Sequence, residues 1–79
     1  MQNTTASLVS NTWVDVGIKA NETTLISLEC VGLYATFGKD TSDNWNVLFG
    51  GYYAIQVNAS GNIEIKLTTY SGTATIYYA

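Results

Sequence analysis

The stretch YAIQVNASGNIEIKL, residues 53–67, decides the fold, because apolar and polar residues alternate on both sides of a short polar segment. The alternating apolar residues are Tyr53, Ile55 and Val57, followed by Ile63, Ile65 and Leu67. A period of two places successive side chains on opposite faces of a β-strand. The intervening NASGN, residues 58–62, supplies Asn, Ser and Gly, which favour turns. The sequence therefore predicts an antiparallel hairpin.

Strand-like segments fill the rest of the chain, and helical periodicity is nearly absent. These segments are TWVDVGI (12–18), TTLISLECV (23–31), LYATFG (33–38) and TATIYY (73–78). Gly32 is expected to turn the chain between two of them, and Ser71-Gly72 to lead into the last strand of a three-strand C-terminal meander. We therefore predict an all-β fold, a single small antiparallel β-sandwich or barrel of about six to seven short strands.

The strand pattern also sets the expected domain boundaries. Residues 1–10 are polar, uncharged and weakly patterned, so we expect a polar N-terminal arm that is free unless something docks it. Residues 11–79 are expected to form the β-sandwich or barrel domain. The longest irregular segment expected inside this domain is GKDTSDNWN, residues 38–46. A chain of 79 residues has no room for a second core.

The composition favours association with other protein. Hydrophobic residues make up 47% of the chain and charged residues only 11%, against about 25% charged in an average domain. A domain this small is marginally stable unless a disulfide, a metal or oligomerisation adds to its stability. Its single cysteine, Cys30, cannot form an intrachain disulfide, and the absence of histidine removes the commonest metal ligand. Oligomerisation is therefore the expected supplement.

Several other classes of partner are not expected. A net charge of −3 with only three basic residues argues against nucleic acid. No apolar run approaches the length of about 20 residues that spans a bilayer. The N-terminal residues lack a basic region followed by an apolar stretch, so no signal peptide is predicted, and the three N-x-S/T sequons are interpreted as products of an Asn/Thr-rich composition.

No group of residues has the pattern of a catalytic or metal site. The six acidic residues are scattered over predicted strands and turns: Asp15, Glu22, Glu29, Asp40, Asp43 and Glu64. Cys30 has no histidine to activate it and is expected to be a small core residue. DTSDN, residues 40–44, lacks the spacing of a calcium-binding loop and is expected to be a solvated turn. We predict no enzyme activity, no cofactor and no metal.

The aromatic residues are more numerous than such a small domain needs for its core. Adjacent tyrosines on a strand point to opposite faces, so Tyr52 is expected outward if Tyr53 is inward, and Tyr77 outward if Tyr78 is inward. We therefore predict four interface candidates: Trp13, Tyr52, Tyr77 and Trp45. Two other interpretations stay open. The aromatics can be cross-strand packing residues, or they can stack sugars, in which case Trp45→Ala would abolish saccharide binding.

Several short segments together resemble small structural proteins of tailed bacteriophages. The matching segments are Trp13 to Val16, Phe37-Gly38, Gly51 to Tyr53, Gly61 to Ile65 and Gly72 to Ile76. The resemblance covers about residues 11–79 and consists of strands and turns rather than a signature motif.

The resemblance implies a virion component assembled in the host cytoplasm, most simply a capsid decoration (cement) protein. It implies partners of two kinds, further copies of the chain in a homotrimer and the major capsid protein. The N-terminal arm would then be able to reach onto the shell. Two alternatives remain: a tail- or fibre-associated subunit, and a small carbohydrate-binding β-sandwich module.

Overall fold

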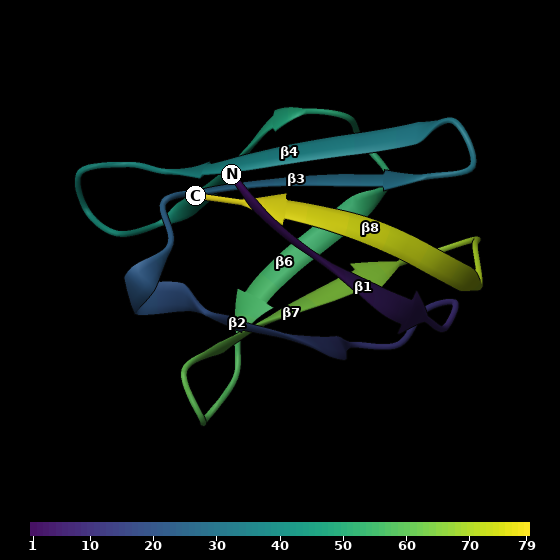
Figure 1. Cartoon of the computed structure of the whole chain (residues 1–79), viewed down its shortest axis with the longest axis horizontal. Helices are drawn as coiled ribbons and strands as arrows, with labels where there is room; N and C mark the ends of the chain where they lie inside the picture. The colour runs from purple at the N-terminus through teal and green to yellow at the C-terminus, as the bar shows by residue number, and fades with distance from the viewer.

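The computed structural model describes residues 1–79 as eight β-strands and one short 3-10 helix (Figure 1). The elements are β1 (Gln2–Leu8), β2 (Val14–Lys19), η1 (Ala20–Glu22), β3 (Leu25–Cys30), β4 (Leu33–Lys39), β5 (Trp45–Phe49), β6 (Tyr53–Val57), β7 (Asn62–Leu67) and β8 (Gly72–Tyr78). The predicted all-β fold is confirmed.

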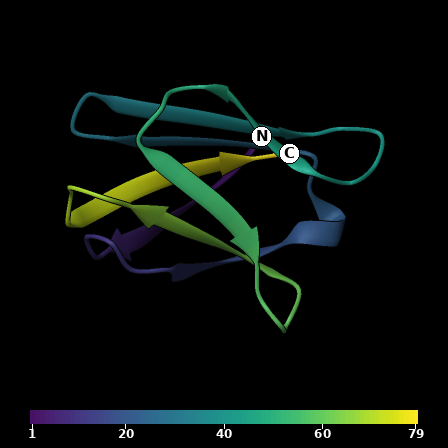
Figure 2. The same cartoon turned by 180° about the vertical axis from the view of Figure 1, so that it is seen from behind.

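The strands form two antiparallel sheets that pack face to face (Figures 1 and 2). The large sheet has five strands in the order β1-β8-β3-β4-β5, and the small sheet has three in the order β2-β7-β6. The edge strands of the large sheet are therefore β1 and β5. The architecture is a small β-sandwich.

The core lies between the sheets and follows from the alternation along each strand. In β7 the residues Ile63, Ile65 and Leu67 are fully buried, while the residues between them point away from the core. Four fully buried side chains of the large sheet pack against them: Ile26, Leu28, Phe37 and Ile76. One buried hydrogen bond joins the sheets, between the Cys30 thiol on β3 and the Tyr53 hydroxyl on β6, at 2.9 Å.

The predicted hairpin over residues 53–67 is confirmed, whereas the predicted three-strand meander is wrong. β6 and β7 pair in register from Tyr53 opposite Leu67 to Val57 opposite Ile63. β8 does not continue this sheet but crosses to the large sheet and lies between β1 and β3. The reason is that both edges of β7 are already paired, one with β6 and the other with β2, so no edge is free for β8.

The N-terminal residues do not form the expected arm, because the structure places them within the β-sandwich. Residues 2–8 form β1, which pairs with β8 along its whole length, and Leu8 is only 2% exposed. Of the alternating inward residues, Thr4 is polar and Ala6 is small, and Leu8 is the one large apolar residue, which hides the strand pattern in the sequence. Together with β5, which occupies part of the expected irregular segment, β1 raises the number of strands above the six or seven expected.

The turn expected at Gly32 is confirmed as a two-residue hairpin loop. Cys30 pairs with Leu33, and the intervening Val31 and Gly32 both have positive φ angles, 41° and 78°. This combination is typical of a type I′ turn, whose twist matches that of the flanking strands.

Candidate functional site

The outward-pointing residues of the large sheet form one continuous surface, which we call the large-sheet face. Its members alternate with the inward-pointing residues of each strand: Asn3, Thr5, Ser7, Leu25, Ser27, Glu29, Tyr34, Thr36, Asn46, Leu48, Phe49, Thr73, Thr75 and Tyr77. Glu29 is its one charged residue. Hydroxyl-bearing side chains make up most of the rest.

The strand register aligns these residues in rows. One row crosses all five strands and consists of Asn3, Tyr77, Ser27, Thr36 and Phe49. Within it the hydroxyls of Ser27 and Thr36 share a hydrogen bond of 2.8 Å. Short side chains that bond to each other leave this row without long charged groups that would hold water.

A second row places Thr5, Thr75, Glu29 and Tyr34 side by side on β1, β8, β3 and β4. Glu29 is exposed and lies between Thr75 and Tyr34. The only charge on the face is therefore near its middle.

The face becomes apolar toward the β5 edge. Tyr34, Leu48 and Phe49 are 54%, 62% and 67% exposed. Leu48 lies over Gly38, where an added Cβ would come within 2.9 Å of the Leu48 Cδ1 atom. Exposed apolar side chains that are neighbours on one surface are typical of a binding surface.

The outer surface of the small sheet is different, because it carries most of the charged strand residues. Asp15 and Lys19 on β2, and Glu64 and Lys66 on β7, point away from the core. Lys66 lies with its Nζ atom 4.9 Å from the centre of the Trp13 ring. Charge is thus segregated: the small sheet presents an ordinary solvated face, and the large sheet does not.

Asp15 is the centre of a polar network on that solvated face. The Gly17 amide donates to Asp15 Oδ1 at 2.8 Å, and the side chains of Asn62 and Asn58 donate to its carboxylate. These hydrogen bonds, that of Gly17 foremost, hold the pKa of Asp15 below its ordinary value of 3.8. The network fixes the β6–β7 turn against β2.

The glycine pair at residues 50 and 51 makes the corner between β5 and β6. Gly50 has a φ of 96°, and a Cβ there would lie 2.1 Å from the Tyr34 carbonyl oxygen. The corner separates Tyr52, which is 63% exposed, from Tyr53, which is buried. The two adjacent tyrosines are therefore divided between the surface and the core, as the alternation along a strand predicts.

The four predicted interface candidates are not brought together. Tyr77 lies on the large-sheet face between Asn3 and Ser27, and Tyr52 is exposed just after the β5–β6 corner. Trp13 is half-buried beneath Lys66 next to the small sheet. Trp45 is half-buried and packs against the core.

The sequence did not identify the hydroxyl-bearing residues as members of one surface. Each of them is an ordinary solvent-facing strand residue when considered alone. Their common surface depends on which strands are neighbours, and β1, β8, β3 and β4 become neighbours only in the folded sheet.

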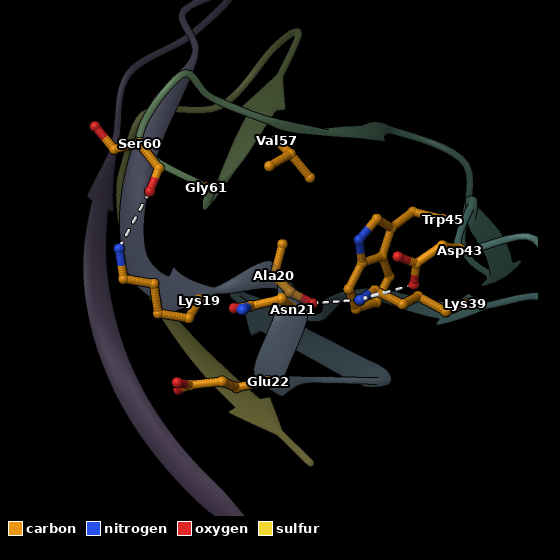
Figure 3. Close-up of a pocket in the computed structure, with 10 residues that line it drawn as sticks. All are labelled: Lys19, Ala20, Asn21, Glu22, Lys39, Asp43, Trp45, Val57, Ser60 and Gly61. Carbon is orange, nitrogen blue, oxygen red and sulfur yellow. Dashed lines mark hydrogen bonds and ion pairs between the residues drawn. The ribbon is translucent and has the colours of Figure 1, made fainter.

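The largest pocket lies at one end of the sandwich and has a volume of about 500 Å³ (Figure 3). Lys39 donates to the Ala20 carbonyl and pairs with Asp43 at 3.2 Å, while Lys19 donates to the Ser60 carbonyl at 3.2 Å. Lys39 also lies 5.3 Å from the centre of the Trp45 ring. Lys39 thus joins β4 to η1, and Lys19 joins β2 to the β6–β7 turn.

Cys30 and Tyr53 are the two titratable groups that meet inside the core. The buried Cys30 thiol contacts only the Tyr53 hydroxyl among polar side chains, and burial raises the pKa of Tyr53 well above its usual value. No group of three His, Cys, Asp or Glu side chains is positioned to hold a metal ion. None of the helical segments has the length and apolar character needed to cross a membrane.

Comparison with protein-family models, curated proteins and solved structures found no match for this chain. The candidate site therefore rests on the geometry and chemistry of the large-sheet face.

Proposed function

We propose that this protein is a non-catalytic binding module that docks its large-sheet face on another protein. The observation that carries the proposal is the segregation of charge between the two outer surfaces. Burying an unpaired charge in an interface is costly, whereas short hydroxyl-bearing and apolar side chains are much less costly to remove from water. The large-sheet face, whose one charge is Glu29, is therefore less costly to remove from water than the outer surface of the small sheet, which carries four charged residues.

The resemblance to phage structural proteins suggests what the face binds. We propose a virion structural protein, most simply a capsid decoration protein that binds and stabilises a shell made of the major capsid protein. A shell presents the same site many times, so modest contacts become effective when several copies bind together. Support for docking comes from the face, and support for the shell as partner comes from the resemblance.

The area of the face limits what one copy alone can contact. Five strands spaced about 4.8 Å apart, each rising about 3.3 Å per residue, span roughly 500 Å² in projection. A standard specific interface buries about 800 Å² of accessible surface on each partner, so the face of one copy is large enough for about one such contact and no more. Self-association, which would place more than one face on the same target, is therefore part of the proposed function.

A matched pair of lysine substitutions tests the proposal. Thr75→Lys places a lysine on the large-sheet face beside Glu29, and Gln56→Lys places one on the small sheet beside Glu64. Each lysine has a cross-strand glutamate as a neighbour, so both variants are expected to fold. Co-sedimentation with shells of the major capsid protein should be lost for Thr75→Lys and retained for Gln56→Lys.

The opposite pattern of co-sedimentation would refute docking through the large-sheet face. Association of the wild-type protein with purified tails instead of shells would favour the tail- or fibre-associated alternative, with the same face in use. The carbohydrate alternative has less structural support, because Trp45 packs against the core and has Lys39 over its ring.

A further inference from the structure

Strand β5 has a free edge whose main-chain groups are placed to pair with another strand. The Lys39 amide donates to the Thr24 carbonyl, on the side of β4 away from β5. Main-chain groups alternate in direction along an antiparallel strand. Trp45, which pairs with Lys39, and Val47, which pairs with Phe37, therefore direct their amide and carbonyl groups away from β4.

This edge lacks most of the features that protect sheet edges. Residues 45–49, WNVLF, contain no charge and no proline. Val47, Leu48 and Phe49 are 49%, 62% and 67% exposed. The one protective feature is the bulge at Leu48, where the register with β4 shifts between Thr36 and Phe37. Regular pairing is thereby limited to Trp45–Val47, ahead of the bulge.

We infer that β5 pairs with β5 of a second copy about a two-fold axis centred on Asn46. Asn46 would face Asn46 of the second copy, and Trp45 would face Val47. The two Trp45–Val47 pairs would exchange about four main-chain hydrogen bonds. No like charges would oppose each other, and the exposed Val47 side chain would be covered by Trp45 of the second copy.

The other free edges are less suited to this contact. The outward side chains of β1 are Asn, Thr and Ser, so pairing there would bury little apolar surface. β6 has an exposed Val57, but its solvent face lies beside Lys66 and Glu64 of β7, and those charges would be partly desolvated. Only β5 combines outward main-chain groups with several exposed apolar side chains.

The two-fold contact would also serve docking. A two-fold axis perpendicular to the sheet turns β5 antiparallel to its copy and keeps both large-sheet faces on the same side. The pair would present a continuous ten-strand surface, about twice the area of one face. This inference rests on the self-association in the proposed function, and it replaces the expected three-fold symmetry with two-fold symmetry.

Cysteine crosslinking tests the register directly. In the proposed pair Asn46 is opposite its own copy in a non-hydrogen-bonded pair, where Cα atoms lie about 4.5 Å apart, within the range of about 4.4–6.8 Å that a disulfide spans. Asn46→Cys should therefore form a covalent dimer under mild oxidation. Gln56→Cys, also exposed and central on an edge strand, should not; the natural Cys30 is buried.

The solution mass provides the second part of the test. The wild-type protein should have a mass of about 17 kDa, twice that of the 8.6 kDa chain, by light scattering. Val47→Lys should reduce the mass to that of one chain, while Val57→Lys, at a valine of nearly equal exposure, 47% against 49%, should not. Thermal unfolding of each variant verifies that it is folded.

The outcomes separate this inference from the proposed function. A trimer, or a dimer in which Asn46→Cys stays reduced, would overturn pairing through β5 and leave self-association standing. A monomer at all concentrations would overturn both the pairing and self-association. A crosslinked dimer that does not bind shells would support the pairing and refute the proposed function.

Discussion

At the scale of single residues, the corner at Gly50 shows why a sequence can require glycine. Gly50 combines a φ of 96° with a close approach to the Tyr34 carbonyl oxygen, whereas a Cβ at Gly51 would meet nothing within 4 Å. Gly50→Ala should lower the free energy of unfolding by about 3 kcal/mol or more, and Gly51→Ala should change it little. Urea denaturation of both variants measures the difference, and equal stabilities would show that the corner is not constrained.

Val31 lies in a strained conformation, because it is a β-branched residue at a position whose positive φ favours Asn or Gly. Its φ is 41°, and its side chain is 80% exposed, so little packing would be lost on replacement. Val31→Asn creates the Asn-Gly pair preferred in type I′ turns and should raise the free energy of unfolding by about 1 kcal/mol. A fall in the thermal unfolding midpoint of this variant would contradict the turn geometry.

Asp40 organises the β4–β5 loop and makes the free energy of unfolding of the protein depend on pH. Its carboxylate accepts hydrogen bonds from the amides of Asn44 and Ser42, which hold its pKa below 3.8. A folded-state pKa below the unfolded value adds stability that is present above about pH 4 and lost as the pH falls through the folded pKa. Asp40→Asn should weaken this acid dependence.

The measurement is the free energy of unfolding at pH values from about 7 down to about 2. The wild-type curve should fall below pH 4 more steeply than that of Asp40→Asn. Asp43→Asn is a suitable control, since Asp43 lies in the same loop but its carboxylate accepts no main-chain hydrogen bond. Parallel curves for wild type and Asp40→Asn would contradict the role given to Asp40.

At the scale of elements, β1 is the largest departure from what the sequence predicts. An arm that is free in solution would tolerate changes at Leu8, but a strand with Leu8 2% exposed would not. Leu8→Ala should cost about 2–5 kcal/mol of unfolding free energy, whereas Val9→Ala, at a residue that is 53% exposed, should cost much less. Equal unfolding midpoints for the two variants would contradict the packing of β1 and support an N-terminal arm that is free in solution.

An element could be predicted from the sequence only where the residues within it determine its structure. The β6–β7 hairpin was predictable, because its alternation and its turn residues are all local. β1 was not, since its inward residues are mostly small or polar and its stability comes from pairing with β8 at the other end of the chain. The placement of β8 likewise depends on β2 occupying the free edge of β7.

At the scale of the whole molecule, the two outer faces differ in chemistry, because the small sheet carries four charged residues and the large-sheet face only Glu29. Low charge in the composition predicted association, and Tyr77 was correctly expected to point outward. The surface itself could not be predicted, because Thr5, Thr75 and Thr36 are far apart in the sequence and come to lie on one face only through the order of the five strands, in which β1 is next to β8 and β3 separates β8 from β4. Strand order is a global property of the sandwich.

Oxidative footprinting of the protein free and bound to shells shows whether the large-sheet face docks, because it reports which aromatic side chains lose contact with water. Docking through the large-sheet face should protect Tyr34, Phe49 and Tyr77 on that face, with Trp13 beside the small sheet oxidised equally in both states. Protection of Trp13 with unchanged oxidation of Tyr34, Phe49 and Tyr77 would contradict it.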